Sequence, residues 1–392
     1  MKNQLIDPLP TLAMANGMRA AQSVLLRYHG HNGLTLDASE IAAATIREEI
    51  SVVQLMDYRG VPIYMLDETS GMASHTFESL VAAVTVAHCM KLGYRHICFS
   101  SGGNLGEALT LYARQAGIKT FSFNPQVNVS ALDGRIFSKG LGHWLIGVRD
   151  AQKNREIALD FSHRAQKALG HDPMVPDFSW RSEALSVRGL FLLDYMLENN
   201  LEFEAITQTI SAGFGPLAIY DTLFEAELAG QLKHVPRFIG VQQEANCFMY
   251  QKWKKTVFPL TSELIVPTLF DHNPDHSFGT FPAFQRMLEE SHGDMVTINW
   301  REFERYITPK TMGYIREQGL FHTIRDGQYV ARSGLMALAG TLKAIDQGLI
   351  RQGPVLHCMC DGVRPGSLPA EAAAVVDSPA DLDELVHDFI NL

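Results

Sequence analysis

The chain has 392 residues, a net charge of −10 at neutral pH, 46% hydrophobic residues and 19% charged residues, which is ordinary for a large globular protein. No basic run is present, so a nucleic-acid partner is not expected. Apolar stretches such as 80–87 are too short to cross a bilayer, and the N-terminal residues lack the apolar core of a signal peptide. The five cysteines are too few and too scattered for a disulfide framework. We therefore expect a cytoplasmic protein without a membrane partner.

Residues 1–60 carry helical patterns but no obvious site. The predicted helices run from Ala13 to Tyr28 and from Ala38 to Glu49, with Asp37 or Ser39 as a cap for the second helix. Val61 to Leu66 predicts a strand.

Beyond residue 76, helical and strand patterns alternate. An apolar helix carries Leu80, Val81 and Val84 and stops at Gly93. Later strands are predicted at His96 to Ser100, Lys119 to Phe123, Trp144 to Val148, Ala205 to Ser211, Arg237 to Gln243, Met295 to Asn299 and Val355 to Met359. Helices are predicted between them at Glu107 to Arg114, Val129 to Phe137, Ala151 to Leu169, Ser182 to Glu198, Leu217 to Ala229, Glu302 to Glu317 and Ser333 to Gln347. This rhythm predicts an α/β protein with parallel strands and right-handed crossovers.

Two glycine-rich turns follow predicted strands and open helices. The first is Ser101-Gly102-Gly103-Asn104, and the second is Ser211-Ala212-Gly213-Phe214-Gly215. Each turn aims backbone N–H groups and the positive end of a helix dipole at one point, which attracts a carboxylate or a phosphate. A glycine turn alone is weak evidence of a site, because many α/β proteins need glycine for backbone geometry.

Two polar loops contain histidines. His29 and His31 flank Gly30, and Asp271, His272, Asp275 and His276 surround an Asn-Pro pair. The first loop has no third ligand nearby, and the second has the composition of a turn, so no metal site is expected.

The segment from Ser74 to Gly117 resembles the pyridoxal 5′-phosphate (PLP) enzymes of fold type II, the tryptophan synthase beta-like superfamily, and most closely the threonine synthase-like enzymes. The resemblance covers approximately residues 60–365. It implies two open parallel-sheet lobes flanked by helices. Residues 61–79 and 146–392 would form the large lobe, residues 80–145 a smaller mobile lobe, and residues 1–60 a helical region packed on the large lobe.

The resemblance also implies roles for individual residues. Ser101, Gly102, Gly103 and Asn104 would hold the substrate carboxylate. Ser211, Ala212, Gly213, Phe214 and Gly215 would cradle a phosphate. Cys360, or Met359 if the register slips by one, would meet the pyridine nitrogen of the cofactor. The family's Schiff-base lysine falls on Glu78, within Thr76-Phe77-Glu78-Ser79.

An acid at position 78 changes the expected chemistry. A carboxylate cannot form the imine through which a lysine amine tethers PLP. Glu78 can still act as a general base, since partial burial raises the pKa of a glutamate toward neutrality. No lysine occurs between Lys2 and Lys91, and Lys91 lies at the far end of the helix that begins near Glu78, roughly 20 Å away at 1.5 Å per residue.

Three functions remain open on the sequence alone. The first is a threonine synthase-like lyase or synthase that acts on a small amino-acid-like or phosphate-bearing substrate without a lysine Schiff base, with Glu78 as the base. The second is a non-catalytic binding or regulatory relative. The third is an ordinary PLP-dependent elimination or replacement enzyme whose lysine was deliberately replaced. PLP held without a lysine imine and the absence of any cofactor are both compatible with the sequence. The resemblance implies a homodimer and a small-molecule substrate.

Overall fold

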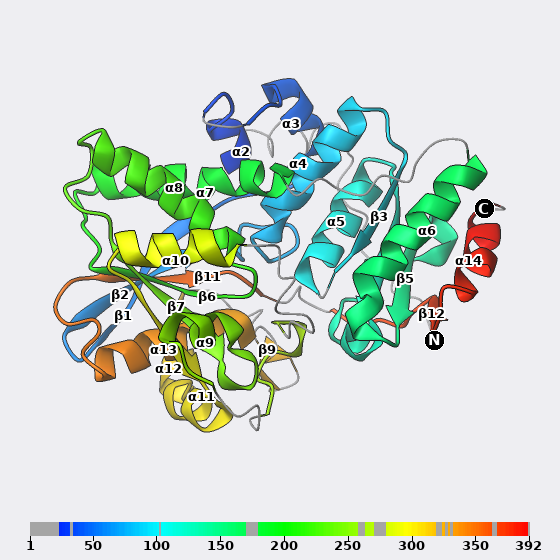
Figure 1. Ribbon diagram of the computed structural model, residues 1–392. Coiled ribbons are helices and arrows are strands. Elements are labelled where there is room, and N and C mark those ends of the chain that lie inside the picture. Colours follow the sequence, from blue (N-terminus) through cyan, green and yellow to red (C-terminus); the bar gives the residue numbers. More distant parts are fainter. Residues whose placement is uncertain are drawn as a thin grey trace, which may run out of the picture.

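The computed structural model describes residues 23–31, 34–101, 103–169, 179–257, 263–269, 280–318, 324–325, 328–329, 332–362 and 367–390. Within these residues the chain forms two main sheets surrounded by helices, and a short hairpin (Figure 1). Most of the helix predicted at Ala13 to Tyr28, the polar loop from Asp271 to His276, and Gly102 of the first glycine turn lie outside the described residues.

The elements alternate along the chain as the sequence predicts. The strands are β1 (Ser51–Tyr58), β2 (Val61–Asp67), β3 (His96–Ser100), β4 (Lys119–Pro125), β5 (His143–Val148), β6 (Ala205–Thr209), β7 (Arg237–Gln243), β8 (Asp294–Ile298), β9 (Ile324–Arg325), β10 (Gln328–Tyr329), β11 (Val355–Met359) and β12 (Ala374–Val376). The α-helices are α2 (Val24–Arg27), α3 (Ala38–Ala44), α4 (Glu78–Lys91), α5 (Asn104–Gln115), α6 (Asn154–Leu169), α7 (Ser179–Glu198), α8 (Phe214–Leu228), α9 (Phe248–Lys254), α10 (Phe281–Glu290), α11 (Trp300–Tyr306), α12 (Pro309–Glu317), α13 (Arg332–Asp346) and α14 (Asp381–Ile390).

The larger sheet has the strand order β1-β2-β11-β6-β7-β8. Its neighbouring strands are parallel except β1, which pairs with β2 as an antiparallel hairpin. Side chains of β11 alternate between two cores. Leu356 and Cys358 pack in the core that contains α7, α8 and α10, whereas Val355 and Met359 pack in the core that contains α11, α12 and α13. Helices therefore cover both faces of this sheet, as parallel strands that are apolar on both sides require (Figure 1).

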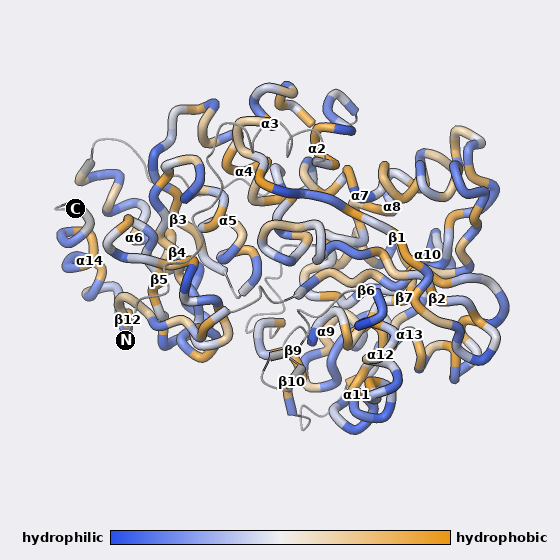
Figure 2. Tube along the Cα trace, turned by 180° about the vertical axis from the view of Figure 1, so that it is seen from behind, coloured by the Kyte–Doolittle hydropathy of each residue, from blue (hydrophilic) through white to orange (hydrophobic). Residues whose placement is uncertain are grey.

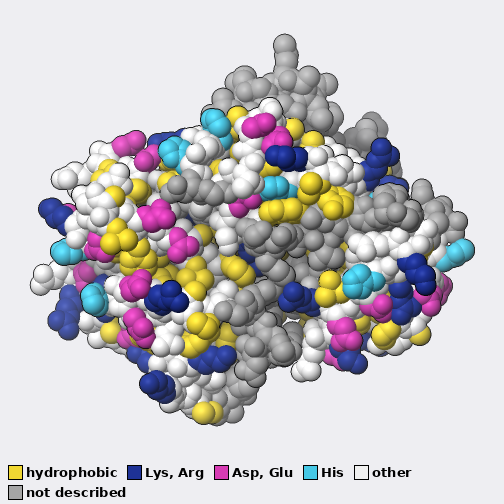
Figure 3. Space-filling model, turned by 45° about the horizontal axis from the view of Figure 1, so that its top comes forward, with side chains coloured by type: hydrophobic (Ala, Val, Ile, Leu, Met, Phe, Trp, Pro, Cys, Tyr) yellow, Lys and Arg dark blue, Asp and Glu magenta, His cyan; other side chains and the backbone are white. Residues whose placement is uncertain are grey.

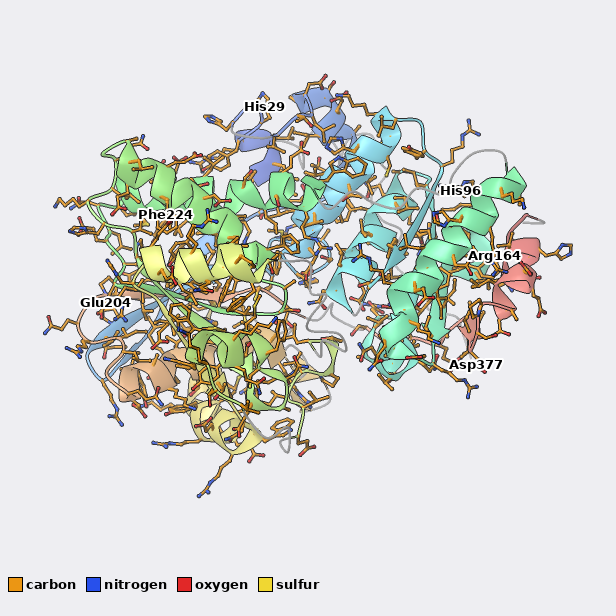
Figure 4. The ribbon with its side chains drawn as sticks, in the orientation of Figure 1. His29, His96, Arg164, Glu204, Phe224 and Asp377 are labelled. Carbon is orange, nitrogen blue, oxygen red and sulfur yellow. The ribbon has the colours of Figure 1, made fainter. Side chains whose placement is uncertain are left out.

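The smaller sheet has the order β12-β5-β4-β3, and all its strands are parallel. One face packs on α6 and α14, with Phe121 and Phe161 among the buried side chains. Arg164 lies on α6 beside α14 (Figure 4). Its guanidinium forms an ion pair of 2.7 Å with Asp383 of α14. The C-terminal segment thus completes the smaller sheet, whose first strand in the sequence begins at His96. The elements α6, β12 and α14 pack with this sheet although they lie outside residues 80–145, the range expected for the smaller lobe.

Most predicted elements are confirmed. The strands β3, β7 and β11 have the predicted bounds. The helix predicted at Val129 to Phe137 is wrong, because the structure has only a short 3-10 helix there, Gln126–Ala131, in a segment with β-branched residues and Gly134. The helix predicted from Glu302 to Glu317 is two helices. Pro309 cannot donate a helical hydrogen bond, and Thr308 caps the second helix instead.

No helix in the described parts of the chain is both long enough and apolar enough to cross a membrane. Hydrophilic and hydrophobic residues alternate along an outer helix such as α14 (Figure 2). On the face shown in Figure 3, acidic and basic side chains are interspersed rather than gathered by sign.

His357 is an unusual residue at the centre of the larger sheet. It lies on β11, between Met65 of β2 and Thr207 of β6, and its side chain is completely buried. Neither ring nitrogen has a hydrogen-bond partner among the described residues. Burial lowers the pKa of His357 to about 3, because the charged imidazolium loses its hydration. The sheet therefore carries a neutral polar ring whose two nitrogens lose the hydrogen bonds that water gives them in the unfolded chain.

We predict that His357→Leu stabilises the protein by about 1 to 3 kcal/mol at pH 7, because it removes two unpaired buried polar atoms. The folded pKa of His357 lies below the unfolded value of 6.5, so the wild type loses stability as the pH falls from 6.5 toward 3, and the variant loses less. Urea unfolding at pH 7 and pH 5 measures both effects. His88→Leu is the control, since His88 contacts the Glu183 carboxylate at 2.8 Å and its loss should destabilise. Equal destabilisation by the two variants would contradict the prediction.

Candidate functional site

A pocket of about 250 Å³ lies where the carboxyl ends of β3, β6 and β11 meet. Ligand sites of α/β proteins form at this edge of parallel sheets. The first residues of α4, α5, α8 and α13 reach the same cavity, together with two side chains from α7, Arg181 and Leu185. The described lining residues are Phe77, Glu78, Val81, Ser100, Ser101, Gly103, Asn104, Leu105, Arg181, Leu185, Gln208, Thr209, Ser211, Ala212, Gly213, Phe214, Gly215, Pro216, Thr268, Leu269, Ser333, Cys360 and Asp361.

Glu78 lines this pocket as the first residue of α4. The backbone N–H of Phe77 donates to the carbonyl of Cys360 at 3.2 Å, and Thr76 forms a β-bridge with Asp361. The turn before the helix is also fixed by a 2.7 Å hydrogen bond between the Ser74 and Ser79 hydroxyls. These contacts place the Glu78 carboxylate beside the carboxyl end of β11.

The environment of Glu78 favours its neutral form. Burial raises its pKa from 4.5 to about 7, and the neighbouring Asp361 carboxylate adds to the rise. A hydrogen bond from Thr76 and the positive charge of Arg181 act in the opposite direction. A glutamate with a pKa near neutrality exchanges protons readily at physiological pH, which a general acid or base requires.

The first glycine turn carries less free hydrogen-bonding capacity than the sequence suggests. The Ser101 hydroxyl accepts from the N–H groups of Gly103 and Gly106 at 3.1 and 3.0 Å, so it caps the start of α5. Gly103 and Asn104 line the pocket, and the N-terminal end of α5 points at it. Gly102, the remaining member of this turn, lies outside the described residues.

The second glycine turn opens α8. Gly213 has a left-handed backbone with φ of +81°, which glycine adopts without steric cost, and the helix begins at Phe214. The Thr280 hydroxyl donates to the carbonyl of Ala212 at 2.5 Å and fixes the turn from outside. At Gly215 there is no room for a side chain, since an added Cβ would lie 2.6 Å from the Gln208 amide. The backbone N–H groups of the turn and the positive end of the helix dipole meet here, a geometry that attracts anions.

A buried ion pair contacts the backbone of the second glycine turn. The Arg188 guanidinium contacts both carboxylate oxygens of Glu68, one of them at 2.6 Å, and neither side chain is exposed. Arg188 also donates to the carbonyl of Gly215 at 2.8 Å and to the Gln208 side chain at 3.2 Å. Burial alone would lower the pKa of Arg188, but the Glu68 carboxylate outweighs it and raises that pKa.

Arg181 brings a positive charge to the pocket itself. It lies in the first turn of α7, and its guanidinium stands 5.0 Å from the centre of the Phe214 ring. Burial lowers the pKa of Arg181 to about 10, and the Glu78 carboxylate opposes that change. Arg181 therefore stays charged at neutral pH, close to both Glu78 and the start of α8.

The carboxyl end of β11 supplies two further groups. Cys360 is a buried thiol whose pKa is raised, chiefly by burial, so it remains neutral. Asp361 accepts a 2.7 Å hydrogen bond from the backbone N–H of Gly334, and burial raises its pKa as well. Either side chain can form a hydrogen bond with a ring nitrogen or a hydroxyl of a bound molecule.

The structure brings the described members of the predicted site together around one cavity: Glu78, Ser101, Gly103, Asn104, Ser211, Ala212, Gly213, Phe214, Gly215 and Cys360. Sequence reasoning missed Arg181, Arg188, Glu68 and Asp361. A signal was present for the two arginines, since they lie seven residues apart in an apolar helix with Leu185 between them, and so share one buried face. Charged residues on an apolar face need a buried partner or a ligand.

This arrangement is the fold of the PLP-dependent enzymes of fold type II, with two open parallel sheets, helices on their faces and a pocket between them. No protein-family model matches the sequence, and no curated protein matches it.

Similarity to known proteins is found among solved structures. The threonine deaminase isoform 2 of Solanum lycopersicum is 13% identical, with a TM-score of 0.56 over 97% of this chain and 90% of that chain. Maize serine racemase is 15% identical, with a TM-score of 0.57 over 84% and 93%. A diaminopropionate ammonia lyase from Escherichia coli, in complex with an aminoacrylate-PLP intermediate, is 12% identical, with a TM-score of 0.56 over 90% of each chain. At these identities the likeness concerns the fold, and the finer resemblance to threonine synthase stays a prediction.

We predict that Arg188→Met lowers the free energy of unfolding by about 3 to 5 kcal/mol, because the Glu68 carboxylate is left buried without its partner. Replacing both residues, by Glu68→Leu with Arg188→Met, should cost less than the single change. Urea unfolding measures the difference.

The control for this prediction is Arg27→Met. Arg27 pairs with Asp194 at 3.1 Å, but the two side chains are 50% and 42% exposed, so the loss should stay below about 1 kcal/mol. Similar losses for Arg188→Met and Arg27→Met would show that the buried pair does not support the fold.

We also predict that Glu78→Gln stabilises the protein at pH 8 and has little effect near pH 4.5. The folded pKa of about 7 lies above the unfolded value of 4.5, so ionisation costs stability as the pH rises between these values. At about 1.36 kcal/mol per pKa unit, the cost is on the order of 3 kcal/mol above pH 7. Unfolding at both pH values tests this, with Glu290→Gln on the exposed end of α10 as a control. A stability change of equal size at both pH values would refute a buried, ionising Glu78.

Proposed function

We propose that this protein is a lyase-type enzyme that acts on a small amino-acid-like or phosphate-bearing substrate without a lysine Schiff base. The observation that carries the proposal is Glu78, a carboxylate that faces a pocket between two helix N-termini. The likeness to PLP-dependent enzymes of fold type II supports an enzyme of this general kind.

The lining residues do not fit PLP bound as an imine. No lysine occurs among the described residues that line the pocket. Lys91 is at the opposite end of α4, where its ammonium group contacts the Glu40 carboxylate at 3.0 Å. The phosphate of the cofactor would suit the turn from Ser211 to Gly215, but its aldehyde would face an acid at position 78. The reaction proposed for this pocket therefore does not involve PLP.

The chain's own residues supply the groups that an elimination needs. The N-terminal end of α5, with Gly103 and Asn104, orients a substrate carboxylate. Glu78 removes a proton from a substrate carbon, and the electrons of that C–H bond form the new double bond as an anionic group leaves. The positive charges of Arg181 and the α8 N-terminus stabilise the departing anion.

The base role of Glu78 predicts a large effect of one substitution. Glu78→Gln should lower kcat by about 10²- to 10⁴-fold on any substrate that the enzyme turns over, because the amide cannot accept the proton. A panel of amino acids and phosphorylated amino acids, followed by product analysis, provides the measurement. In the wild type, kcat/KM should rise with pH through about 7, as Glu78 ionises. Unchanged turnover in Glu78→Gln would exclude Glu78 as the base.

Borohydride reduction tests the absence of an imine directly. The wild-type protein is incubated with PLP, reduced and analysed by mass spectrometry, and we expect no cofactor fixed to the chain. Glu78→Lys is the matched variant and should gain fixed cofactor at position 78 if the rest of the pocket is intact. Cofactor fixed to a lysine of the wild type would overturn the proposed function.

A further inference from the structure

One carboxylate oxygen of a residue that lines the pocket has no hydrogen-bond donor among the described residues. Oε2 of Glu78 is buried and has no partner among the described residues. The described chain has other buried polar atoms without partners, but Glu78 is the one such residue that lines the pocket. A buried acceptor without a donor costs about 1 to 3 kcal/mol, and more when it is charged. A ligand that supplies a donor at this point removes that cost.

The charges around the cavity have an ordered polarity. Glu78 and Asp361 are the acids among the described lining residues, and both belong to the side formed by α4 and the end of β11. Arg181 is the one described lining residue with a basic side chain, and it lies over Phe214 at the start of α8. Arg181 is near enough to Glu78 for the two charges to interact, and together with the N–H groups of the second glycine turn it makes the α8 end of the pocket positive.

This polarity distinguishes between chemical groups. A protonated amine carries three donors and a positive charge, and therefore satisfies a carboxylate that has an unpaired oxygen. An aldehyde or a simple carboxylate offers acceptors alone and leaves Oε2 of Glu78 unpaired. On the positive side, a helix N-terminus together with an arginine favours a dianion such as a phosphate monoester.

We propose that the pocket binds, without a covalent bond, a small molecule that carries both a protonated primary amine and a phosphate. The amine donates to Oε2 of Glu78, and the phosphate lies against Arg181 and the turn from Ser211 to Gly215. This inference rests on the pocket of the proposed function and names the ligand class of that site. Such a molecule has two sources: the amine form of the cofactor, pyridoxamine 5′-phosphate, or a phosphorylated amino compound that serves as substrate.

Matched ligand pairs isolate the amine. Isothermal titration calorimetry at pH 8 compares pyridoxamine 5′-phosphate with pyridoxine 5′-phosphate, and 2-aminoethyl phosphate with 2-hydroxyethyl phosphate. Each pair differs by an ammonium group in place of a hydroxyl. We expect the amine of at least one pair to bind the wild type tenfold or more tightly than its hydroxyl counterpart. The pair with the tighter amine identifies the source.

Two variants assign the contacts. In Glu78→Gln the amine preference should fall to within about threefold, while the hydroxyl compounds bind as before. In Arg181→Met all four phosphates should weaken by a similar factor, with the amine preference retained. Circular dichroism and thermal unfolding confirm that each variant is folded.

Other outcomes overturn the inference. Equal affinity for amine and hydroxyl in both pairs, an amine preference that survives in Glu78→Gln, or no binding of any of the four compounds by folded wild-type protein would each refute it. These results are separate from those for the proposed function, because titration involves no turnover. If Glu78→Gln loses turnover but the wild type shows no amine preference, then Glu78 acts as a base and does not accept a hydrogen bond from a ligand ammonium group.

Discussion

The ion pair between Glu68 and Arg188 is the contact on which the arrangement of the pocket depends. Glu68 follows β2, Arg188 lies in α7, and the guanidinium reaches the carbonyl of Gly215 in α8. One pair of side chains thereby joins a strand and two helices beneath the second glycine turn. Separating the two side chains would leave a charge buried where it is poorly solvated. This cost disfavours any movement of the joined elements relative to one another.

Much of the fold follows from local sequence patterns. The buried strands are short apolar runs between turn signals, and β3, β7 and β11 could be located from this pattern alone. The two glycine turns were recognisable because each stands between a strand and a helix. Their meeting at one cavity was expected only from the family resemblance, since no local pattern specifies which strands become neighbours.

Other features depend on tertiary contacts and could not be predicted locally. The strand β1 has polar residues at several positions and belongs to an edge, where one side of the backbone needs no strand partner. The place of Arg188 on the apolar face of α7 indicates that it needs a buried partner, but no local pattern shows that this partner is Glu68. The helix predicted at Val129 to Phe137 failed because the apolar residues there pack under β5 from a short 3-10 turn rather than along a helix face.

The pairing of β12 with β5 has a consequence for how the protein is made. Val376 lies beside Val148, so the outer strand of the smaller sheet comes from a segment synthesised more than two hundred residues after its neighbour. Until β12 has been synthesised, the backbone N–H and C=O groups on one edge of β5 have no strand partner. An unpaired edge of this kind can pair with strands of other chains. This sheet is therefore completed by a contact between segments far apart in the sequence, and pairings of this kind form slowly.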